Sequence, residues 1–498
     1  MPPAAPPRRA CGATPEPTPM FPDTLSGFAS NLWSLTLVVL FFGGSIFVHE
    51  LGHYLAARWR GVKVERFSIG FGPAIVSWLG RDGVEYRISW IPLGGYVLLP
   101  QLADLGPVEG KSTLDVESLP PIAYLSKMIV FVAGALFNVL FAFGLACVVW
   151  VAGQPTIAEW NTTQIGHLSP TIRLPDGSTA PNPAIEAGLL PGDIVRSIDG
   201  VEVKNFEDII TNIFLGRERA GDGRRKAVFV VEREGRRHEL TVYPRLVGEE
   251  NVRSAGIEPS EDLTVEAVGP GTPAETAGVK PGDRIVAVDG TPMFQRLALS
   301  EHLAKNSQRP VEFLLRRADA DLHLPIQPRL ETDERTGSKV ARVGIRYRDS
   351  IIIIHPSPFL QIWDNVTGTF RTLGALLSPN SDIGPSKLSG PIGIARELHR
   401  QAQWDFRRLL WFTILINVNL AIFNLLPIPV LDGGQMVFAS VARLRGRALP
   451  ANFIITTQSV FMVLLLSMIL YVSFFDVARL RRESRPADPA PRTAPAKP

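Results

Sequence analysis

Two histidines and a glutamate stand together in a long apolar stretch of the sequence, as His49-Glu50-Leu51-Gly52-His53. If this stretch is helical, His49 and His53 lie one turn apart on the same face, so both imidazoles can bind one Zn²⁺. Glu50 is a candidate general base that takes a proton from metal-bound water. The pattern also occurs by chance on surface helices. Inside an apolar helix, however, such side chains are costly to bury unless they are paired or bound to a metal, which favours a metal site.

A third metal ligand must come from elsewhere, because hydrolytic zinc sites keep three protein ligands and leave one position for water. Asp432, in the stretch NLLPIPVLDGG, is the candidate. In a chain with four spans, the first and third spans run parallel, which would place Asp432 in the same leaflet as the histidines. Asp432 could instead be an ordinary residue of an Asp-Gly turn. The prediction is one zinc ion per chain, held by His49, His53 and Asp432.

Four apolar segments have the length of about 20 residues that a helix needs to cross the hydrocarbon core. Basic residues gather in the loops after the first and third segments, so we expect both loops on the cytoplasmic side and the long middle region outside. The basic residues that follow the fourth segment argue against this orientation. The predicted spans are Leu32–Arg58, Ile122–Val151, Leu409–Ile428 and Phe453–Phe475.

The region between the second and third spans is soluble in composition and contains an internal repeat. AIEAGLLPGDIVRSIDG at Ala184–Gly200 matches AETAGVKPGDRIVAVDG at Ala274–Gly290. A polar helical stretch and then β-like alternation follow each copy. The repeat looks like two tandem PDZ domains of the circularly permuted bacterial kind, which capture a peptide by adding it to a sheet edge. A spacer or size filter with empty grooves is the alternative.

The overall composition excludes several classes of protein. Hydrophobic residues make up 46% of the 498 residues and charged residues only 20%, which is little charge for a soluble protein. The net charge of +3, without a basic stripe, argues against a nucleic-acid partner. Two cysteines, Cys11 and Cys147, cannot form a disulfide framework. The Pro- and Ala-rich ends, residues 1–27 and 481–498, are predicted to be disordered, and Met20 is an alternative start.

The motifs in combination resemble the PDZ-containing branch of the site-2 protease family of zinc metalloproteases, from about residue 28 to about residue 478. They are H-E-x-x-H in the first span, N-x-x-P-x-P-x-x-D-G at the third and the repeat between them. The resemblance implies that His49, His53 and Asp432 bind zinc and that Glu50 is the catalytic acid and base. It implies that four residues help to hold and unwind a substrate helix, namely Asn419, Asn424, Pro427 and Pro429. Asn138 and Gly433 are further candidates for the site.

Pro427 and Pro429 have a physical interpretation without the family. They remove backbone donors and break a regular helix, which leaves polar backbone at membrane depth. An extended strand there could pair with an unwound substrate, or the helix could simply end before a loop. Asn138 in the second span could hydrogen-bond near the site or form an ordinary bond between helices.

Two further regions show periodic patterns. Val62–Gly72 and Tyr86–Val97 alternate like β-strands, and the resemblance implies a membrane-dipping β-hairpin region that presents an edge to substrate. Apolar residues recur at helical spacing between Phe359 and Leu377. That stretch could lie on the membrane surface or pack as an ordinary helix.

The predicted fold is therefore a polytopic α-helical membrane protein with four transmembrane helices. Two tandem permuted PDZ domains, α+β and mostly β, are inserted between helices two and three. The predicted domains are an extension (1–27), the first half of the membrane core (28–156), two PDZ domains (157–250 and 251–345), the second half of the core (346–480) and a tail (481–498).

The predicted function is zinc-dependent hydrolysis of peptide bonds within transmembrane segments. The resemblance implies a bacterial inner-membrane enzyme, and the basic loops and the parallel spans predict periplasmic PDZ domains and a zinc site toward the cytoplasmic leaflet. Its implied substrates are pre-trimmed single-span proteins in the lipid bilayer, such as anti-sigma factors or remnant signal peptides. The PDZ domains would bind new C-termini or exclude uncut proteins by bulk. The alternatives are a non-catalytic PDZ scaffold with a zinc site and a zinc transporter.

Overall fold

The computed structural model describes residues 23–102, 119–248, 251–332, 339–348 and 350–483. The chain divides into two compact units, residues up to 142 with residues 390–467, and residues 143–389 with residues from 468 onward. Residues 23–27 and 481–483, which we predicted to be disordered, are helical, because the apolar helices that they adjoin extend over them. The rest of the two predicted ends falls outside the described residues, as do Cys11 and Met20.

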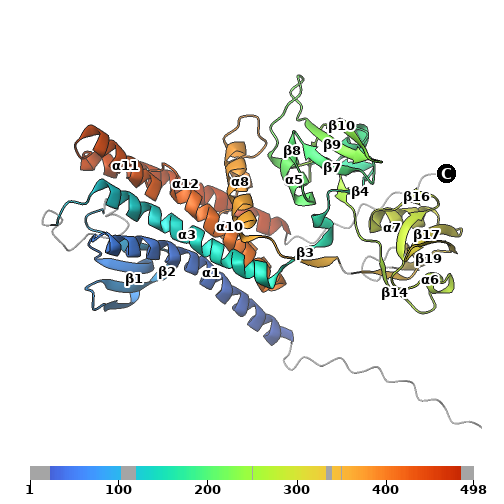
Figure 1. The fold of residues 1–498 in the computed structure, drawn as a ribbon, viewed down its shortest axis with the longest axis horizontal. Helices are drawn as coiled ribbons and strands as arrows, with labels where there is room; N and C mark the ends of the chain where they lie inside the picture. The colour runs from blue at the N-terminus through green and yellow to red at the C-terminus, as the bar shows by residue number, and fades with distance from the viewer. Residues whose placement is uncertain (1–22, 103–118, 249–250, 333–338, 349, 484–498) are drawn as a thin grey trace, which may run out of the picture. The chain divides into compact units, whose positions relative to one another are not determined.

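Within the described residues, four helices are long and apolar enough to cross a membrane, in agreement with the predicted number of spans. Many of their apolar side chains are exposed, for example Leu464, Leu466 and Leu470. Such a large apolar surface suits lipid rather than water. The four helices, visible in Figure 1, are α1 (Asp23–Trp59), α3 (Tyr124–Ala152), α10 (Phe406–Asn424) and α12 (Ala451–Glu483).

In the first unit, α1 and α10 run side by side in the same direction, and α9 (Pro391–Trp404) packs against both. The parallel direction follows from the contacts, because their order is the same along both helices. It confirms the parallel arrangement that we predicted from the number of spans. The contacting pairs are Phe41 with Phe406, Ser45 with Asn417, and His49 with Asn424.

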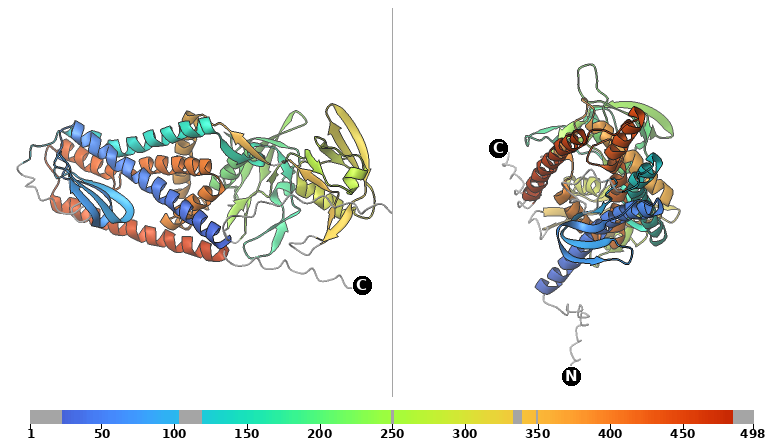
Figure 2. Two further views of the ribbon diagram at one scale, coloured as in Figure 1. Left: turned by 90° about the horizontal axis from the view of Figure 1, so that it is seen from below. Right: turned by 90° about the vertical axis from the view of Figure 1, so that its left-hand side faces the viewer.

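Strands β1 (Arg66–Leu79) and β2 (Glu85–Leu98) pack beside α1, as the two views in Figure 2 show. Residues 66–69 pair on one side with residues 95–98 and on the other with residues 85–88, while residues 74–79 pair with residues 85–89. The β1–β2 sheet is thus a curled sheet of four segments, and more elaborate than the predicted hairpin. Its bends lie at glycines with positive φ, namely Gly70, Gly72 and Gly94.

The second unit contains two β-rich modules with the same order of elements. Read from the same edge, the main sheet of the first module has the order β8-β7-β9-β10, and that of the second has the order β16-β15-β17-β18. The elements of the first module are α4 (Pro183–Glu186), β7 (Ile194–Ile198), β8 (Val201–Glu202), α5 (Phe206–Leu215), β9 (Ala227–Arg233) and β10 (Arg236–Val242). Those of the second module are α6 (Pro273–Thr276), β15 (Arg284–Val288), β16 (Thr291–Pro292), α7 (Arg296–Lys305), β17 (Val311–Arg317) and β18 (Ala320–Ile326).

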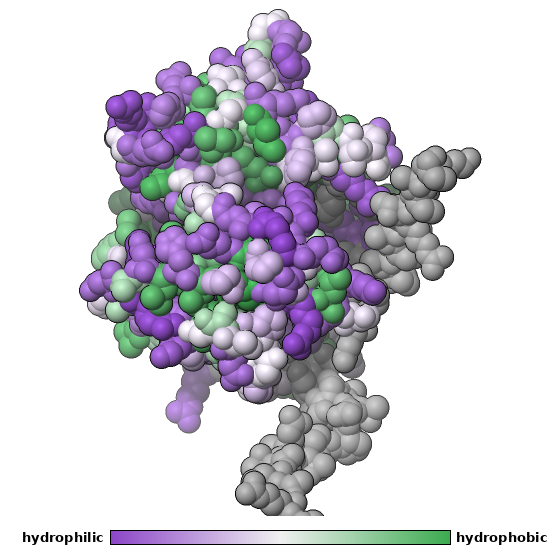
Figure 3. All heavy atoms as spheres, turned by 90° about the vertical axis from the view of Figure 1, so that its right-hand side faces the viewer, coloured by the Kyte–Doolittle hydropathy of each residue, from purple (hydrophilic) through white to green (hydrophobic). Residues whose placement is uncertain are grey.

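The two modules also match residue by residue where the repeat predicts it. Asp199 and Asp289, at equivalent positions, both have positive φ, and each precedes a glycine that also has positive φ. This geometry suits a tight hairpin turn. Each module has its own core, around Phe229 in the first and Phe313 in the second. The face of the chain shown in Figure 3 is mostly hydrophilic, with scattered apolar side chains.

Short strand pairs complete the second unit. β4 (Ile165–His167) pairs with β13 (Glu258–Pro259), and β14 (Val265–Val268) pairs with β21 (Ile345–Tyr347). β3 (Gln154–Ile157) pairs with β22 (Ile351–Ile354), so the chain entering the modules is joined to the chain leaving them. The remaining strands are β5 (Thr171–Arg173), β6 (Thr179–Pro181), β11 (Arg245–Val247), β12 (Val252–Ser254), β19 (Arg329–Thr332) and β20 (Lys339–Arg342).

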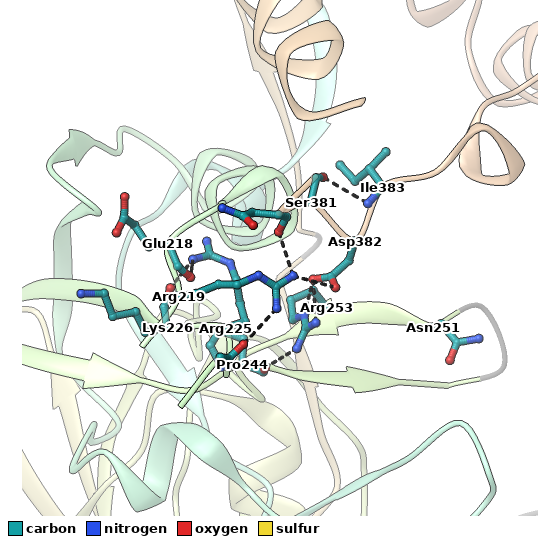
Figure 4. Close-up of polar contacts among 12 residues, drawn as sticks. Glu218, Arg219, Arg225, Lys226, Pro244, Asn251, Arg253, Ser381, Asp382 and Ile383 are labelled. Atoms are coloured by element: carbon teal, nitrogen blue, oxygen red, sulfur yellow. Dashed lines mark hydrogen bonds and ion pairs between the residues drawn. The ribbon is translucent and has the colours of Figure 1, made fainter. Parts of the chain in front are cut away.

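Helix α8 (Pro358–Leu376) carries exposed apolar side chains that include Phe359, Trp363 and Phe370. The segment after it, residues 377–388, is attached to the first module (Figure 4). Asp382 Oδ2 accepts hydrogen bonds from Arg253 at 2.6 and 3.0 Å. Arg219 also donates to the carbonyl oxygen of Asn380 at 2.8 Å.

Candidate active site

The side chains of His49, His53 and Asp432 converge in the first unit. The two Nε2 atoms are 3.1 Å apart, and Asp432 Oδ2 lies 3.3 Å from Nε2 of His49 and 3.4 Å from Nε2 of His53. Among the described residues, this is the one group of His, Cys, Asp or Glu side chains close enough to hold a metal ion. The buried Asp432 Oδ2 accepts no hydrogen bond from the described residues, so the donor set fits a cation at this point.

His53 is oriented by the backbone of α3. Its Nδ1 lies 2.8 Å from the carbonyl oxygen of Val130, which can only accept a hydrogen bond. The ring proton therefore sits on Nδ1, and the lone pair of Nε2 points toward Asp432, as a metal ligand requires. The sequence carries no signal for this contact, because any residue at position 130 would present the same backbone carbonyl.

His49 is oriented by Asn138 of α3, whose amide nitrogen lies 3.3 Å from Nδ1 of His49. Asn138 Oδ1 is buried without a partner. With the amide rotated by 180°, Oδ1 would accept the Nδ1 proton and leave Nε2 of His49 free for a metal. Asn138 therefore lies beside the ligands, where one of the two sequence interpretations put it.

Two glycine positions let α1 and α3 approach closely at the site. A Cβ on Gly52 would lie 2.4 Å from the carbonyl oxygen of Ala133, and a Cβ on Gly134 would lie 2.4 Å from His53 Nε2. Small residues at such positions let helix backbones touch in a membrane. The imidazoles are therefore packed directly against the backbone of α3.

Asp432 is positioned by a compact turn, which corrects the extended strand that we expected from Pro427 and Pro429. Residues 425–431 form turns and bends, with Ile428 N–H donating to Leu426 O at 2.7 Å and Leu431 N–H to Ile428 O at 2.9 Å. The chain curls back on itself because these local bonds satisfy the backbone that the prolines release from the helix. Pro427 is exposed, whereas Pro429 is buried.

Helix α11 (Asp432–Arg445) begins at the candidate ligand itself. A Cβ on Gly433 would lie 2.3 Å from Leu426 O, and one on Gly434 would lie 2.2 Å from Ile428 O. The two glycines thus allow the first turn of α11 to pack onto the preceding turn. Gln435 adds a hydrogen bond to the carbonyl oxygen of Pro429 at 3.2 Å. This packing fixes the carboxylate of Asp432 against the histidines.

Glu50 lies next to the ligands and under the β1–β2 sheet. The backbone N–H of Val97 lies near its carboxylate. A Cβ on Gly95 would lie 3.0 Å from Glu50 Cγ, so β2 passes directly over this side chain. The sheet therefore covers the candidate general base.

Asn419 and Asn424, the two asparagines of α10 that the sequence predicted for the site, lie on different faces of the helix. Asn424 is 3.5 Å from His49 Nε2 through its amide nitrogen. Asn419, five positions earlier and partly exposed, is rotated by roughly 140° around the helix axis. Of the two, the structure brings Asn424 to the site.

The chain is also similar in sequence to known proteins. The sequence pattern of peptidase family M50 matches residues 37–468. The chain is 30% identical over 470 residues to the regulator of sigma E protease of Salmonella typhi, and 30% identical over 475 residues to that of Escherichia coli K12, each alignment covering 89% of this chain and 99% of the relative. A protein of Vibrio cholerae that is named a zinc metalloprotease is 28% identical over 483 residues, with 90% of this chain and 99% of the relative covered. The chain therefore belongs to peptidase family M50, the site-2 protease family, and is a metalloprotease.

Proposed function

We propose that this protein hydrolyses peptide bonds within membrane-spanning segments, with one zinc ion per chain held by His49, His53 and Asp432. The observation that carries the proposal is the approach of two Nε2 atoms and one carboxylate oxygen to within 3.1–3.4 Å of one another. The histidines lie on a helix with the length and composition of a membrane span. When bound, zinc would polarise the scissile carbonyl and lower the pKa of its water.

In this proposal Glu50 moves the proton. Its carboxylate accepts the proton of the attacking water and later delivers it to the leaving amine. Strand β2, which passes over Glu50 at Gly95, keeps the carboxylate beside the proposed ligands. Asn138 Oδ1 keeps the proton of His49 on Nδ1, and Val130 O does the same for His53.

The substrate must unwind at the site, because a helix hides its amides from a nucleophile. We propose that Asn424, beside His49, orients the unwound segment, and that Asn419, Pro427 and Pro429 contribute to its binding. The exposure of Pro427 in the turn supports a contact with substrate. Gly433 acts indirectly in this proposal, because it lets α11 pack where Asp432 can reach the histidines.

The proposed substrates are pre-trimmed single-span proteins, such as anti-sigma factors, and remnant signal peptides. The names of the relatives, which include regulator of sigma E protease, support this class. The basic residues at the ends of α1 and α11 support an inner-membrane location with the zinc site toward the cytoplasmic leaflet and the modules outside.

We further propose that the two β-rich modules are permuted PDZ domains, with the boundaries 157–250 and 251–345. The shared order of elements and the matched turns at Asp199 and Asp289 support this assignment. As PDZ domains they would bind new C-termini or exclude uncut proteins by bulk.

The experiment is cleavage of a tagged single-span protein by the purified full chain in lipid vesicles, with bound zinc measured on the same samples. Glu50→Gln should keep its zinc and lose cleavage by about 10²- to 10⁴-fold. His53→Ala should lose both, and the exposed control His238→Ala should lose neither. Cleavage by Glu50→Gln at the wild-type rate would overturn the proposal in favour of a scaffold. Zinc flux into the vesicles without cleavage would favour a transporter.

A further inference from the structure

Two polar side chains are completely buried between α1 and α10, before the candidate metal site along both helices. Asn417 Nδ2 donates to Ser45 Oγ at 2.8 Å and to the carbonyl oxygen of Thr413 at 2.9 Å. Ser45 Oγ in turn donates to the carbonyl oxygen of Phe41 at 2.8 Å. Both Ser45 and Asn417 have an exposed fraction of 0%. Neither belongs to a motif that the sequence singled out.

This pair does not satisfy all of its own polar atoms. Asn417 Oδ1 is buried and has no hydrogen-bond partner. A buried acceptor without a donor destabilises a fold, and an apolar side chain of similar size would avoid that cost. Ser45 would remain satisfied without Asn417, because its hydroxyl still donates to Phe41 O. Stability alone therefore does not explain an asparagine at this position.

The position of the pair relates it to the metal site. Ser45 precedes His49 by four residues on α1, and Asn417 precedes Asn424 by seven residues on α10, so each pair of residues shares one helix face. The contacts Ser45–Asn417 at 2.8 Å and His49–Asn424 at 3.5 Å therefore join the same two faces. Apolar neighbours such as Leu409 and Ile416 also pack there, but apolar contacts have no preferred direction. A hydrogen bond does, and it restricts the rotation of one helix against the other.

We infer that Asn417 is a positioning residue for the metal site. Its hydrogen bond to Ser45 fixes the rotation of α10 about its own axis relative to α1. That rotation places Asn424 against His49, and through the turn at 425–431 it places Asp432 against both imidazoles. The inference rests on the proposed zinc site and adds a residue pair that acts on the site through the helix.

The test compares zinc affinity with stability in Asn417→Leu, using the purified full chain in lipid vesicles. We expect the zinc dissociation constant, measured by competition with a chelator, to rise about 10-fold or more, as is typical when support behind a metal ligand is lost. Thermal stability of the zinc-free protein should be unchanged or higher, because the unpaired acceptor is gone. The visible spectrum of the Co²⁺-substituted protein should change, since the ligand geometry changes.

Two further variants complete the test. Thr413→Val is the matched control, because Thr413 is buried on the same helix and its hydroxyl bonds only to Leu409 O of that helix, at 2.8 Å. It should keep wild-type zinc affinity. The exchange Ser45→Asn with Asn417→Ser should restore much of the affinity lost in Asn417→Leu.

Two outcomes would overturn the inference. One is wild-type zinc affinity and Co²⁺ spectrum in Asn417→Leu. The other is that both Asn417→Leu and Thr413→Val lose zinc affinity, each in proportion to its loss of thermal stability without zinc. Wild-type protein that binds no zinc would instead overturn the proposed function, and the two failures are thus distinguishable.

Discussion

Gly134 of α3 lies so close to His53 of α1 that a Cβ on residue 134 would be 2.4 Å from Nε2, the atom proposed to bind zinc. The same Cβ would be 2.7 Å from His49 Cε1. The backbone of α3 has little freedom to retreat, because Gly52 and Ala133 hold the two helices in contact one residue away.

Gly134→Ala should therefore abolish stoichiometric zinc binding. The added methyl group displaces the imidazole of His53 from its ligand position, although alanine favours the helix more than glycine does. Zinc content per chain, measured by elemental analysis of purified protein, checks this. Gly144→Ala on the same helix is the control, since a Cβ there meets nothing within 4 Å. A zinc-replete Gly134→Ala protein would contradict the geometry described here.

Asn138 should matter to the site through the acceptor that it offers to His49. Asn138→Leu removes that acceptor and should weaken zinc binding by about 10- to 100-fold. Asn138→Asp keeps an oxygen toward Nδ1 and should retain much of the affinity. Chelator competition on both variants distinguishes an acceptor from a mere packing residue, for which the two substitutions would behave alike.

Asp82, at the turn of the β1–β2 sheet, should tie that sheet to α1. It accepts hydrogen bonds from Tyr54 at 2.9 Å, Tyr86 at 3.0 Å and Arg58 at 2.5 Å. Partial desolvation raises the pKa of Asp82, but the bonds from Tyr54 and Tyr86, with those from Val84 N–H and Arg58, outweigh it and hold the pKa at about 2, against an ordinary value of 3.8. Asp82→Asn should speed tryptic cleavage after the neighbouring exposed Arg81 at neutral pH.

The same carboxylate gives a pH dependence with a definite sign. Because the folded pKa lies below the ordinary value, the stabilisation is fully present above about pH 4 and is lost as the pH falls toward 2. Pepsin digestion of the sheet should therefore differ between wild type and Asp82→Asn at pH 4 and converge near pH 2. Asp176→Asn is the control, since Asp176 bonds only to Ser178, two residues away. A difference that persists at pH 2 would refute this role.

Asp382 should hold the segment 377–388 on the first module. Its partner Arg253 is mostly buried, so Asp382→Asn should weaken the attachment by about 1–2 kcal/mol. Faster hydrogen exchange of the backbone amides of residues 377–388, with unchanged exchange in β9, would show this. Asp321→Asn breaks an exposed pair with Arg316 and should leave that segment unchanged.

The convergence of the proposed ligands was predictable from the sequence because helical spacing and membrane crossings are regular. His49 and His53 share a face by their four-residue spacing, and the number of spans makes α1 and α10 parallel, as the order of their contacts confirms. These arguments need only the type and position of a few residues.

The support around the ligands was not predictable in the same way. The contact of His53 with Val130 O and the closeness of Gly134 depend on how α3 is rotated, which many weak apolar contacts decide together. The turn at 425–431 depends on Gly433 and Gly434, whose role is visible only once the chain has curled back. In β1, residues 66–69 pair with two segments of β2 at once, and alternation alone cannot show such a register.

The pairing of β3 with β22 has a consequence for how the inserted region is connected to the rest of the chain. Gln154 lies opposite Ile354 and Ile157 opposite Ile351, so the residues that begin and end the inserted modules are neighbours across a ladder about 5 Å wide. A short hairpin could bridge that gap without moving α3 or α8. The inserted region therefore leaves and rejoins the rest of the chain at a single point.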